Sequence, residues 1–186
     1  MRLFVSLNIE ESIRARLSEI AGSLRTEIEQ QYTDSVKWDK PENYHVTLFF
    51  IGDVEDHSLP KLINELVFIQ KKFTGKEISF SSDNFNAFPD KRKPRILFAG
   101  LSNPDGNAYS LSESIRSAMA LFGFKDDKPF HPHITLGRVK KEKRISLAKI
   151  EAGKFNIEFT CKEFFLMESN MRQGGSEYKV LRSFIL

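Results

Sequence analysis

The stretches "PENYHVTLFF" (41–50) and "PFHPHITLGR" (129–138) decide the fold, because the same short pattern occurs in both. His-Val-Thr-Leu at 45–48 corresponds to His-Ile-Thr-Leu at 133–136, and in each case a proline lies four residues before the histidine. Because proline lacks a backbone N–H, it fits at the end of a loop that leads into a strand. Two matching contexts in one chain indicate a repeated structural unit.

Each tetrad predicts a strand with one polar and one apolar face. Successive side chains of a strand point to opposite faces, so His45 and Thr47 share one face while Val46 and Leu48 share the other. The second tetrad alternates in the same way. If a pseudo-two-fold axis relates the two halves, the apolar faces pack on the core and the polar faces meet across a cleft. We therefore expect the two His-x-Thr pairs to line one site.

The order of the predicted elements also repeats. Apolar residues at three- and four-residue spacing predict helices, and short runs rich in β-branched and aromatic residues predict strands. The patterns predict strands at 2–7, 44–52, 77–88, 95–101, 133–139, 154–168 and 177–185, and helices at 10–30, 59–72, within 103–124 and, briefly, at 146–152. We expect an α+β chain of two β-α-β-α-β rounds, with halves at roughly 1–93 and 94–186 of a single domain spanning 1–186.

The composition is that of a globular protein with one core. The chain has 186 residues, of which 40% are hydrophobic and 17 are phenylalanine, and this predicts a substantial packed interior. A net charge of +3 is compatible with a polyanionic partner but does not require one. The single cysteine excludes an internal disulfide, the first residues lack a signal-peptide pattern, and no apolar run is long enough to span a membrane. We expect a cytoplasmic protein without membrane contact.

A pair of histidines suits the hydrolysis of a phosphodiester without a metal ion. One neutral imidazole can take a proton from an attacking hydroxyl group or water, while an imidazolium gives a proton to the leaving oxygen. The charge on the phosphoryl oxygens needs fixed donors, for which Thr47, Thr135 and Arg138 are the nearest candidates. The pattern therefore predicts His45 and His133 as catalytic residues and the other three as phosphate-binding residues.

The position of Arg138 does not fit the alternation of side chains in a regular strand. Arg138 follows His133 by five residues, so an uninterrupted strand would point the two side chains to opposite faces. Gly137 permits a β-bulge or a strand end, either of which would return the arginine to the face of the histidine. We expect such an irregularity at this position.

The other histidines, the cysteine and the remaining basic residues are not predicted to be catalytic. His57 lies in a polar turn and Cys161 in a strand, and we expect a structural role for each. His131 has no histidine counterpart before the first tetrad, so we expect it at a loop end, where it supports its neighbour. The basic segment 91–95 is either a solvated loop or a site that attracts an RNA phosphate backbone. Arg172, beside a glycine turn, could reach a phosphate.

Two other classes of function stay open. His131 and His133, together with His45, could bind a metal ion, although Pro132 and the lack of an acidic ligand in the tetrads argue against it. The chain could also be a module that binds RNA ends without turning them over.

Five segments, in the same order along the chain, carry a family resemblance. They are "MRLFVSLNI" (1–9), "VKWDKPENYHVTLFFIGDV" (36–54), "KPRILFAGL" (93–101), "FHPHITLGRVK" (130–140) and "FLMESNMRQGGSEYKVL" (165–181). With the paired tetrads, they resemble the 2H phosphoesterase superfamily, and within it the prokaryotic RNA 2′,3′-cyclic phosphodiesterases once named 2′-5′ RNA ligases. The resemblance covers nearly the whole chain. One departure is His131, where the family pattern has threonine or another small residue.

The resemblance implies a bilobal α+β fold in which two antiparallel sheets flank a central cleft, with one tetrad from each lobe. It implies that His45 donates a proton to the leaving 3′ oxygen. It also implies that His133 accepts a proton from the attacking water, which leaves a 2′-phosphomonoester. Thr47, Thr135 and Arg138 would bind the phosphoryl oxygens.

The resemblance also implies the partners. The expected substrate is RNA with a 2′,3′-cyclic phosphate end or a small cyclic nucleotide, bound by a monomer that needs no cofactor and no metal. A ligation reaction, which joins such an end to a 5′-hydroxyl group through a 2′-5′ linkage, would use the same residues. The sequence leaves the choice between hydrolysis and ligation open.

Overall fold

The observed elements follow the predicted order closely in the computed structural model, which describes residues 1–126, 128–150, 155–172 and 175–186. The strands are β1 (Arg2–Asn8), β2 (Val36–Trp38), β3 (His45–Asp53), β4 (Ile78–Ser82), β5 (Phe85–Phe88), β6 (Ile96–Gly100), β7 (His133–Val139), β8 (Ile157–Cys161), β9 (Glu163–Arg172) and β10 (Gly175–Ile185). The helices are α1 (Glu11–Gln31), α2 (Leu59–Phe73) and α3 (Asn107–Leu121), with short 3-10 helices η1 (Pro41–Asn43) and η2 (Asp56–Ser58).

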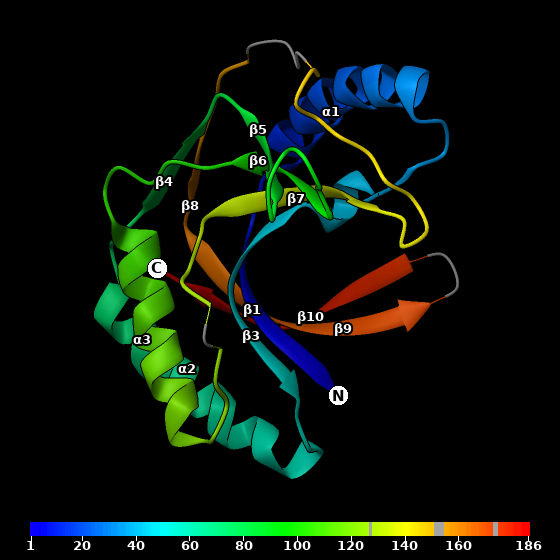
Figure 1. Cartoon of the computed structure of the whole chain (residues 1–186). Coiled ribbons are helices and arrows are strands. Elements are labelled where there is room, and N and C mark those ends of the chain that lie inside the picture. Colours follow the sequence, from blue (N-terminus) through cyan, green and yellow to red (C-terminus); the bar gives the residue numbers. More distant parts are fainter. Residues whose placement is uncertain (127, 151–154, 173–174) are drawn as a thin grey trace.

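Strands from the whole chain meet in one antiparallel sheet, in the order β10-β9-β1-β3-β7-β6-β5, with β2 paired to β7. A separate antiparallel pair consists of β4 and β8. Figure 1 shows α2 and α3 side by side, with α1 on a different part of the molecule. The predicted α+β class with antiparallel sheets is confirmed. We call β10, β9, β1 and β3 the first half-sheet, and β7, β6, β5 and β2 the second half-sheet.

The two half-sheets join through a single pair of residues. Val46 of β3 pairs with Ile134 of β7 in antiparallel register, and both side chains are fully buried. This register puts His45 across from Thr135, and likewise puts the threonine of the first tetrad across from the histidine of the second. Because side chains alternate, all four polar residues of the tetrads point away from the core that holds Val46 and Ile134.

The half-sheets do not coincide with the sequence halves 1–93 and 94–186. From the second sequence half, β9 pairs with β1, and β10 pairs with β9, in the first half-sheet. From the first sequence half, β2 pairs with β7 and β5 pairs with β6 in the second half-sheet. Each half-sheet therefore contains two strands from each half of the sequence.

A β-bulge follows the threonine in both tetrad strands. The pairing of β3 with β1 skips Leu48, directly after Thr47. The pairing of β7 with β6 skips Leu136, directly after Thr135. One extra residue shifts the alternation of side chains, so the third residue after each threonine returns to the face of that threonine.

In both bulges, the backbone carbonyl of the skipped residue accepts a hydrogen bond from a group outside the strand pairing. The hydroxyl of Ser112, a buried residue of α3, donates to the carbonyl oxygen of Leu48 at 2.8 Å. The backbone N–H of Asp39 donates to the carbonyl oxygen of Leu136 at 2.9 Å. Because an unpaired buried carbonyl is costly, these two hydrogen bonds stabilise the irregular strand geometry.

The helices supply much of the remaining core. The residues that α1 buries, Leu17, Ala21, Leu24 and Ile28, all belong to its predicted apolar stripe, and they share one core cluster with the apolar residues of the tetrads. Of the helices described, none combines the length and the apolar character that crossing a membrane requires.

Three predicted elements differ from the structure. The strand expected at 77–88 is two strands, β4 and β5, and the strand expected at 154–168 is also two, β8 and β9; in both cases the two strands lie in different sheets. The short helix expected at 146–152 does not form at 146–150, while 151–152 lie outside the described residues. Ile145 and Leu147 are both buried, and Leu147 N–H donates to the carbonyl oxygen of Lys91 at 2.7 Å. Burial at a spacing of two suits extended chain, not a helix, which explains the difference.

The pairing of β2 with β7 leaves no room for a side chain at Gly137. A Cβ there would lie 2.9 Å from Val36 Cγ1 and 3.1 Å from the carbonyl oxygen of Lys37, so β2 would have to move. We expect Gly137→Ala to lower the free energy of unfolding by about 1–3 kcal/mol, as overpacking of a close-packed interior does. Urea denaturation measures the change.

Gly22→Ala is the matched control, since an added Cβ at this position in α1 meets no atom within 4 Å. It should raise the free energy of unfolding by about 0.5–1 kcal/mol, because alanine is the better helix former. Equal effects of the two substitutions would contradict the crowding at Gly137.

Candidate active site

The two tetrad histidines are held in the same way. Nδ1 of His45 lies 2.6 Å from the carbonyl oxygen of Asn43, and Nδ1 of His133 lies 2.7 Å from that of His131. Because a carbonyl oxygen only accepts, Nδ1–H donates in both rings, which leaves Nε2 of each neutral ring as an acceptor. Nε2 of His45 faces the Thr47 hydroxyl at 3.0 Å. Both imidazoles are therefore fixed in a tautomer that suits proton transfer at Nε2.

Aromatic side chains surround the imidazole of His45. The ring centroids of Phe4 in β1 and Tyr178 in β10 lie 5.1 and 5.2 Å from it. Burial lowers the pKa of His45 to about 4, although the hydrogen bond to Asn43 acts in the opposite direction. The charge of His133 lowers this pKa further, so the two imidazoles lie within electrostatic reach of each other.

His133 has an equivalent environment in the second half-sheet. The ring centroids of Phe88 in β5 and Phe98 in β6 both lie 5.2 Å from its ring. Burial lowers the pKa of His133, and the charges of His131 and Arg138 act in the same direction. Most of the His133 population is therefore neutral at pH 7 in the free protein, as is His45.

Two adjoining cavities open in front of the tetrads. The smaller cavity measures about 130 Å³ and is lined by four of the predicted site residues, namely His45, Thr47, Thr135 and Arg138. His133 lines the larger cavity, which measures about 600 Å³. Thr47 and Phe50 belong to both walls, so the two cavities adjoin, and we call them together the depression. The structure thus brings all five predicted site residues to one place.

The bulges decide which side chains accompany the histidines. Arg138 lies three residues after Thr135 and lines the smaller cavity with it, so the predicted irregularity is present, although the bulged residue is Leu136, directly before Gly137. The corresponding residue in the other strand, three after Thr47, is Phe50. The tetrads of β3 and β7 and their bulges correspond, but the residue three after the threonine differs between the two strands. One side of the site therefore carries a guanidinium group and the other a phenyl ring.

His131 has the supporting role that its position predicts. Its carbonyl oxygen accepts the Nδ1–H of His133, and its exposed ring lines the larger cavity. The carbonyl of Asn43 does the same for His45, two residues earlier in the first strand. Both tetrads therefore use the backbone carbonyl two residues before the histidine to fix its tautomer.

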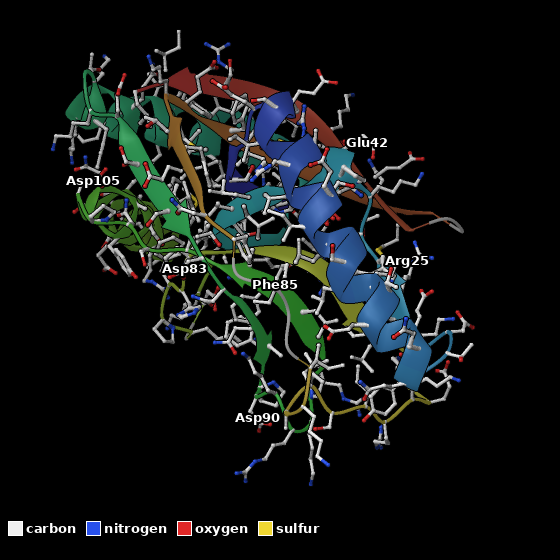
Figure 2. All side chains as sticks on the ribbon, turned by 90° about the horizontal axis from the view of Figure 1, so that it is seen from above. Arg25, Glu42, Asp83, Phe85, Asp90 and Asp105 are labelled. Atoms are coloured by element: carbon white, nitrogen blue, oxygen red, sulfur yellow. The ribbon has the colours of Figure 1, made fainter. Side chains whose placement is uncertain are left out.

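The basic segment 91–95 forms the end of the β5–β6 hairpin, where Figure 2 shows Asp90 at the tip. The Asp90 carboxylate accepts the backbone N–H groups of Arg92 and Lys93 at 2.7 and 3.0 Å. Arg95 lines the larger cavity. Arg172 ends β9, but its side chain lies outside the described residues.

Cys161 and His57 have structural surroundings. Cys161 is buried in β8, where its thiol donates to the carbonyl oxygen of Asn8 at 3.5 Å and burial raises its pKa to about 12. A thiol in this state is a poor nucleophile. His57 is exposed on η2, 3.3 Å from the Glu55 carboxylate. Both expectations of a structural role agree with these contacts.

Sequence reasoning missed Asp39, which lines the smaller cavity beside Arg138. Burial raises the pKa of Asp39, against the opposing charges of Arg138 and Lys37. It also missed Phe50, which the pseudo-symmetry of the tetrads could have matched to Arg138. The described residues contain no group of three or more His, Cys, Asp or Glu side chains arranged to hold a metal ion.

Comparisons with known proteins show the family to which the chain belongs. A family model described as the 2′-5′ RNA ligase superfamily matches residues 8–172. A protein named RNA 2′,3′-cyclic phosphodiesterase from Archaeoglobus fulgidus is 31% identical over 187 residues, which cover 99% of each chain. A protein of the same name from Thermotoga maritima is 31% identical over 182 residues, covering 97% of this chain and 93% of the relative.

Solved structures share the fold over the full chain. The protein TT0787 of Thermus thermophilus superposes with a TM-score of 0.81 at 26% identity, covering 100% of this chain and 98% of the other. LigT of E. coli, solved in complex with 3′-AMP, gives a TM-score of 0.72 at 23% identity, with 100% and 97% covered, which shows the likeness of fold alone. With its paired tetrads, its fold and a family match over most of its length, the chain belongs to the 2′-5′ RNA ligase superfamily.

Proposed function

We propose that the protein hydrolyses the 2′,3′-cyclic phosphodiester at RNA ends to a 2′-phosphomonoester, by acid-base catalysis with His45 and His133 and without a metal ion. The relatives from A. fulgidus and T. maritima bear the name of this activity. The observation that carries the proposal is the pair of imidazoles, both with Nδ1–H tied to a backbone carbonyl and both lining one depression.

In the proposed reaction, water attacks the phosphorus opposite the 3′ oxygen. A bond forms between phosphorus and the water oxygen, and the bond from phosphorus to O3′ breaks. Nε2 of His133 takes the proton of the water, and Nε2–H of the His45 imidazolium gives a proton to O3′. The products are a 2′-phosphomonoester and a 3′-hydroxyl group, and solvent exchange restores the protonation states.

Three side chains in the smaller cavity are suited to the phosphoryl group. The hydroxyls of Thr47 and Thr135 and the guanidinium of Arg138 are hydrogen-bond donors that line this cavity together, where the phosphoryl group would lie. The Thr47 hydroxyl faces Nε2 of His45 in the free protein and would turn to the phosphate when the substrate enters. Arg138 can donate two parallel hydrogen bonds to a phosphoryl group.

His45 acquires its donor role only with the substrate. Since burial lowers its pKa to about 4, His45 is neutral in the free protein at pH 7. A bound cyclic phosphate carries one negative charge, which favours an imidazolium beside it and so raises the pKa. The same negative charge also favours protonation of His133, so the two sites share their proton uptake.

Ligation would follow the same path as the proposed hydrolysis with a different nucleophile. A 5′-hydroxyl group of RNA would attack the phosphorus in place of water, His133 would take its proton, and His45 would give a proton to O3′ as the bond from phosphorus to O3′ breaks. The description of the matching family as a 2′-5′ RNA ligase superfamily favours testing ligation as well. The proposal takes the protein to act as a cytoplasmic monomer.

His45→Ala and His133→Ala, made singly, should each lower the rate of cyclic-phosphate opening by about 10²- to 10⁴-fold, as loss of a general acid or base does. The assay uses an oligoribonucleotide with a 2′,3′-cyclic phosphate end in the presence of a chelator, and chromatography identifies the monoester that forms. His57→Ala, on the exposed 3-10 helix η2, is the control and should keep the wild-type rate.

Near-normal turnover of either tetrad variant would refute the two-histidine mechanism. Loss of wild-type activity in the chelator would refute its independence of metal. Tight binding of RNA ends without any product would assign the protein to the non-catalytic class instead.

The pH dependence should report both histidines. In the free protein both pKa values lie below the usual 6.5, that of His45 at about 4. Catalysis needs one imidazole charged and one neutral, so kcat/KM should be greatest between these pKa values and should fall about tenfold per pH unit above both. Because bound phosphate raises both pKa values, the alkaline limb of kcat should lie at higher pH than that of kcat/KM. A kcat/KM optimum above pH 7 contradicts this.

A further inference from the structure

A third cavity, of about 500 Å³, adjoins the candidate site. It shares Asp39 and Arg138 with the smaller cavity that contains His45. Three exposed lysines from the segments around β2 and β7 line it, namely Lys37, Lys40 and Lys141. Within the described residues, none of these three lysines forms an ion pair. We call this cavity the basic groove.

The charges of the basic groove do not cancel. Three acidic residues, Asp39, Glu142 and Glu177, line it as well, and Lys140 on its wall is paired with Asp34 at 2.5 Å, so the four remaining cations exceed the carboxylates by one. The three other lysines and Arg138 remain directed to a groove that opens from the phosphate-binding residues. Such a row of cations, continuous with a phosphate site, is complementary to a chain of phosphodiesters.

The larger cavity, on the other side of the site, is more aromatic than the basic groove, although Arg95 and Lys128 also line it. Phe50, Phe88 and Phe130 line it, and its Arg116 donates to the backbone carbonyls of Asp126 and Lys128. This guanidinium is therefore engaged within the protein. The contrast follows from the bulged strands, which place Arg138 toward the basic groove and Phe50 toward the larger cavity.

The stereochemistry of a cyclic-phosphate end indicates on which side of the site the 5′ part of the RNA chain lies. O3′ is bonded to C3′, whose neighbour C4′ carries the 5′ chain, whereas O2′ is on the side of C1′ and the base. The proton donor to O3′ thus lies on the side of the 5′ chain. His45 has that role in the proposed function, and the cavity of His45 is the one that shares its wall with the basic groove.

We propose that the basic groove binds the phosphodiester backbone of the nucleotides on the 5′ side of the RNA end, so that oligoribonucleotides are better substrates than cyclic mononucleotides. This inference rests on the proposed function, because it takes the position of the reacting phosphate from it. Each of the three lysines contacts the backbone as a point charge and therefore adds affinity without base specificity.

The test compares two substrates with the same 3′ base. One is a tetraribonucleotide with a 2′,3′-cyclic phosphate, and the other is the corresponding nucleoside 2′,3′-cyclic phosphate. Wild-type protein should show the higher kcat/KM for the tetranucleotide. A fourfold rise in salt should lower that value by about 20-fold for three lysine–phosphate contacts on a single strand. The mononucleotide should lose far less.

The triple variant Lys37→Gln/Lys40→Gln/Lys141→Gln should reduce the ratio of kcat/KM between tetranucleotide and mononucleotide at least tenfold. It should also flatten the salt dependence of the tetranucleotide. The matched control is Lys61→Gln/Lys71→Gln/Lys72→Gln, which removes three charges from α2, outside the cavities of the site. The control should keep the wild-type ratio, which separates a local contact from an effect of net charge.

A second measurement locates the contact on the RNA. Replacing the first linkage on the 5′ side of the end by a neutral methylphosphonate should lower kcat/KM for wild-type protein, but should lower it less for the triple variant. Such non-additivity is the sign of a direct interaction between the changed groups.

The outcomes separate this inference from the proposed function. Wild-type hydrolysis of both substrates with equal kcat/KM, or an unchanged ratio in the triple variant, would refute the binding of the RNA backbone in the basic groove. Neither result would affect the proposed hydrolase activity. An equal loss of ratio in the α2 control would also refute that binding. Hydrolysis of neither substrate would instead overturn the proposed function.

Discussion

The candidate site depends on one backbone pair, Val46 with Ile134, where the two half-sheets meet. Both side chains are fully buried, so the register cannot slip by one residue without exposing them and turning the histidines inward. The antiparallel pairing places each tetrad histidine across from the threonine of the other tetrad. The approach of two imidazoles and two hydroxyls is thus a consequence of core packing, in which the apolar residues of the tetrads determine where the polar ones lie.

The bulges after Thr47 and Thr135 determine which further side chains line the depression. An extra residue in each strand brings the third residue after the threonine into the depression, and this residue is Arg138 in one strand and Phe50 in the other. The backbone geometry is therefore repeated while the chemistry is not. A near-symmetric frame gives an asymmetric site, which suits the proposed substrate, with its charged chain on one side and a base on the other.

Much of this could be predicted from the sequence, because the decisive features are local. Alternation in the tetrads indicated the shared face, and Gly137 indicated the irregularity that returns Arg138 to it. The strand exchange between sequence halves could not be predicted, since no local pattern says whether β9 pairs with β1 or β6. The helix expected at 146–152 failed at 146–150 because the burial of Ile145 and Leu147 depends on distant contacts. Asp39 was missed because nothing in its neighbourhood repeats.

The exchange of strands has a consequence for how the molecule is made. During synthesis the first tetrad strand leaves the ribosome long before β9 and β10, which are the outer strands of its half-sheet and include the Tyr178 ring beside His45. The first 93 residues therefore cannot complete either half-sheet by themselves. Until β10 is made, the smaller cavity lacks the wall that Tyr178 provides, so a product truncated before that strand has an unfinished first half-sheet and an incomplete cavity around His45.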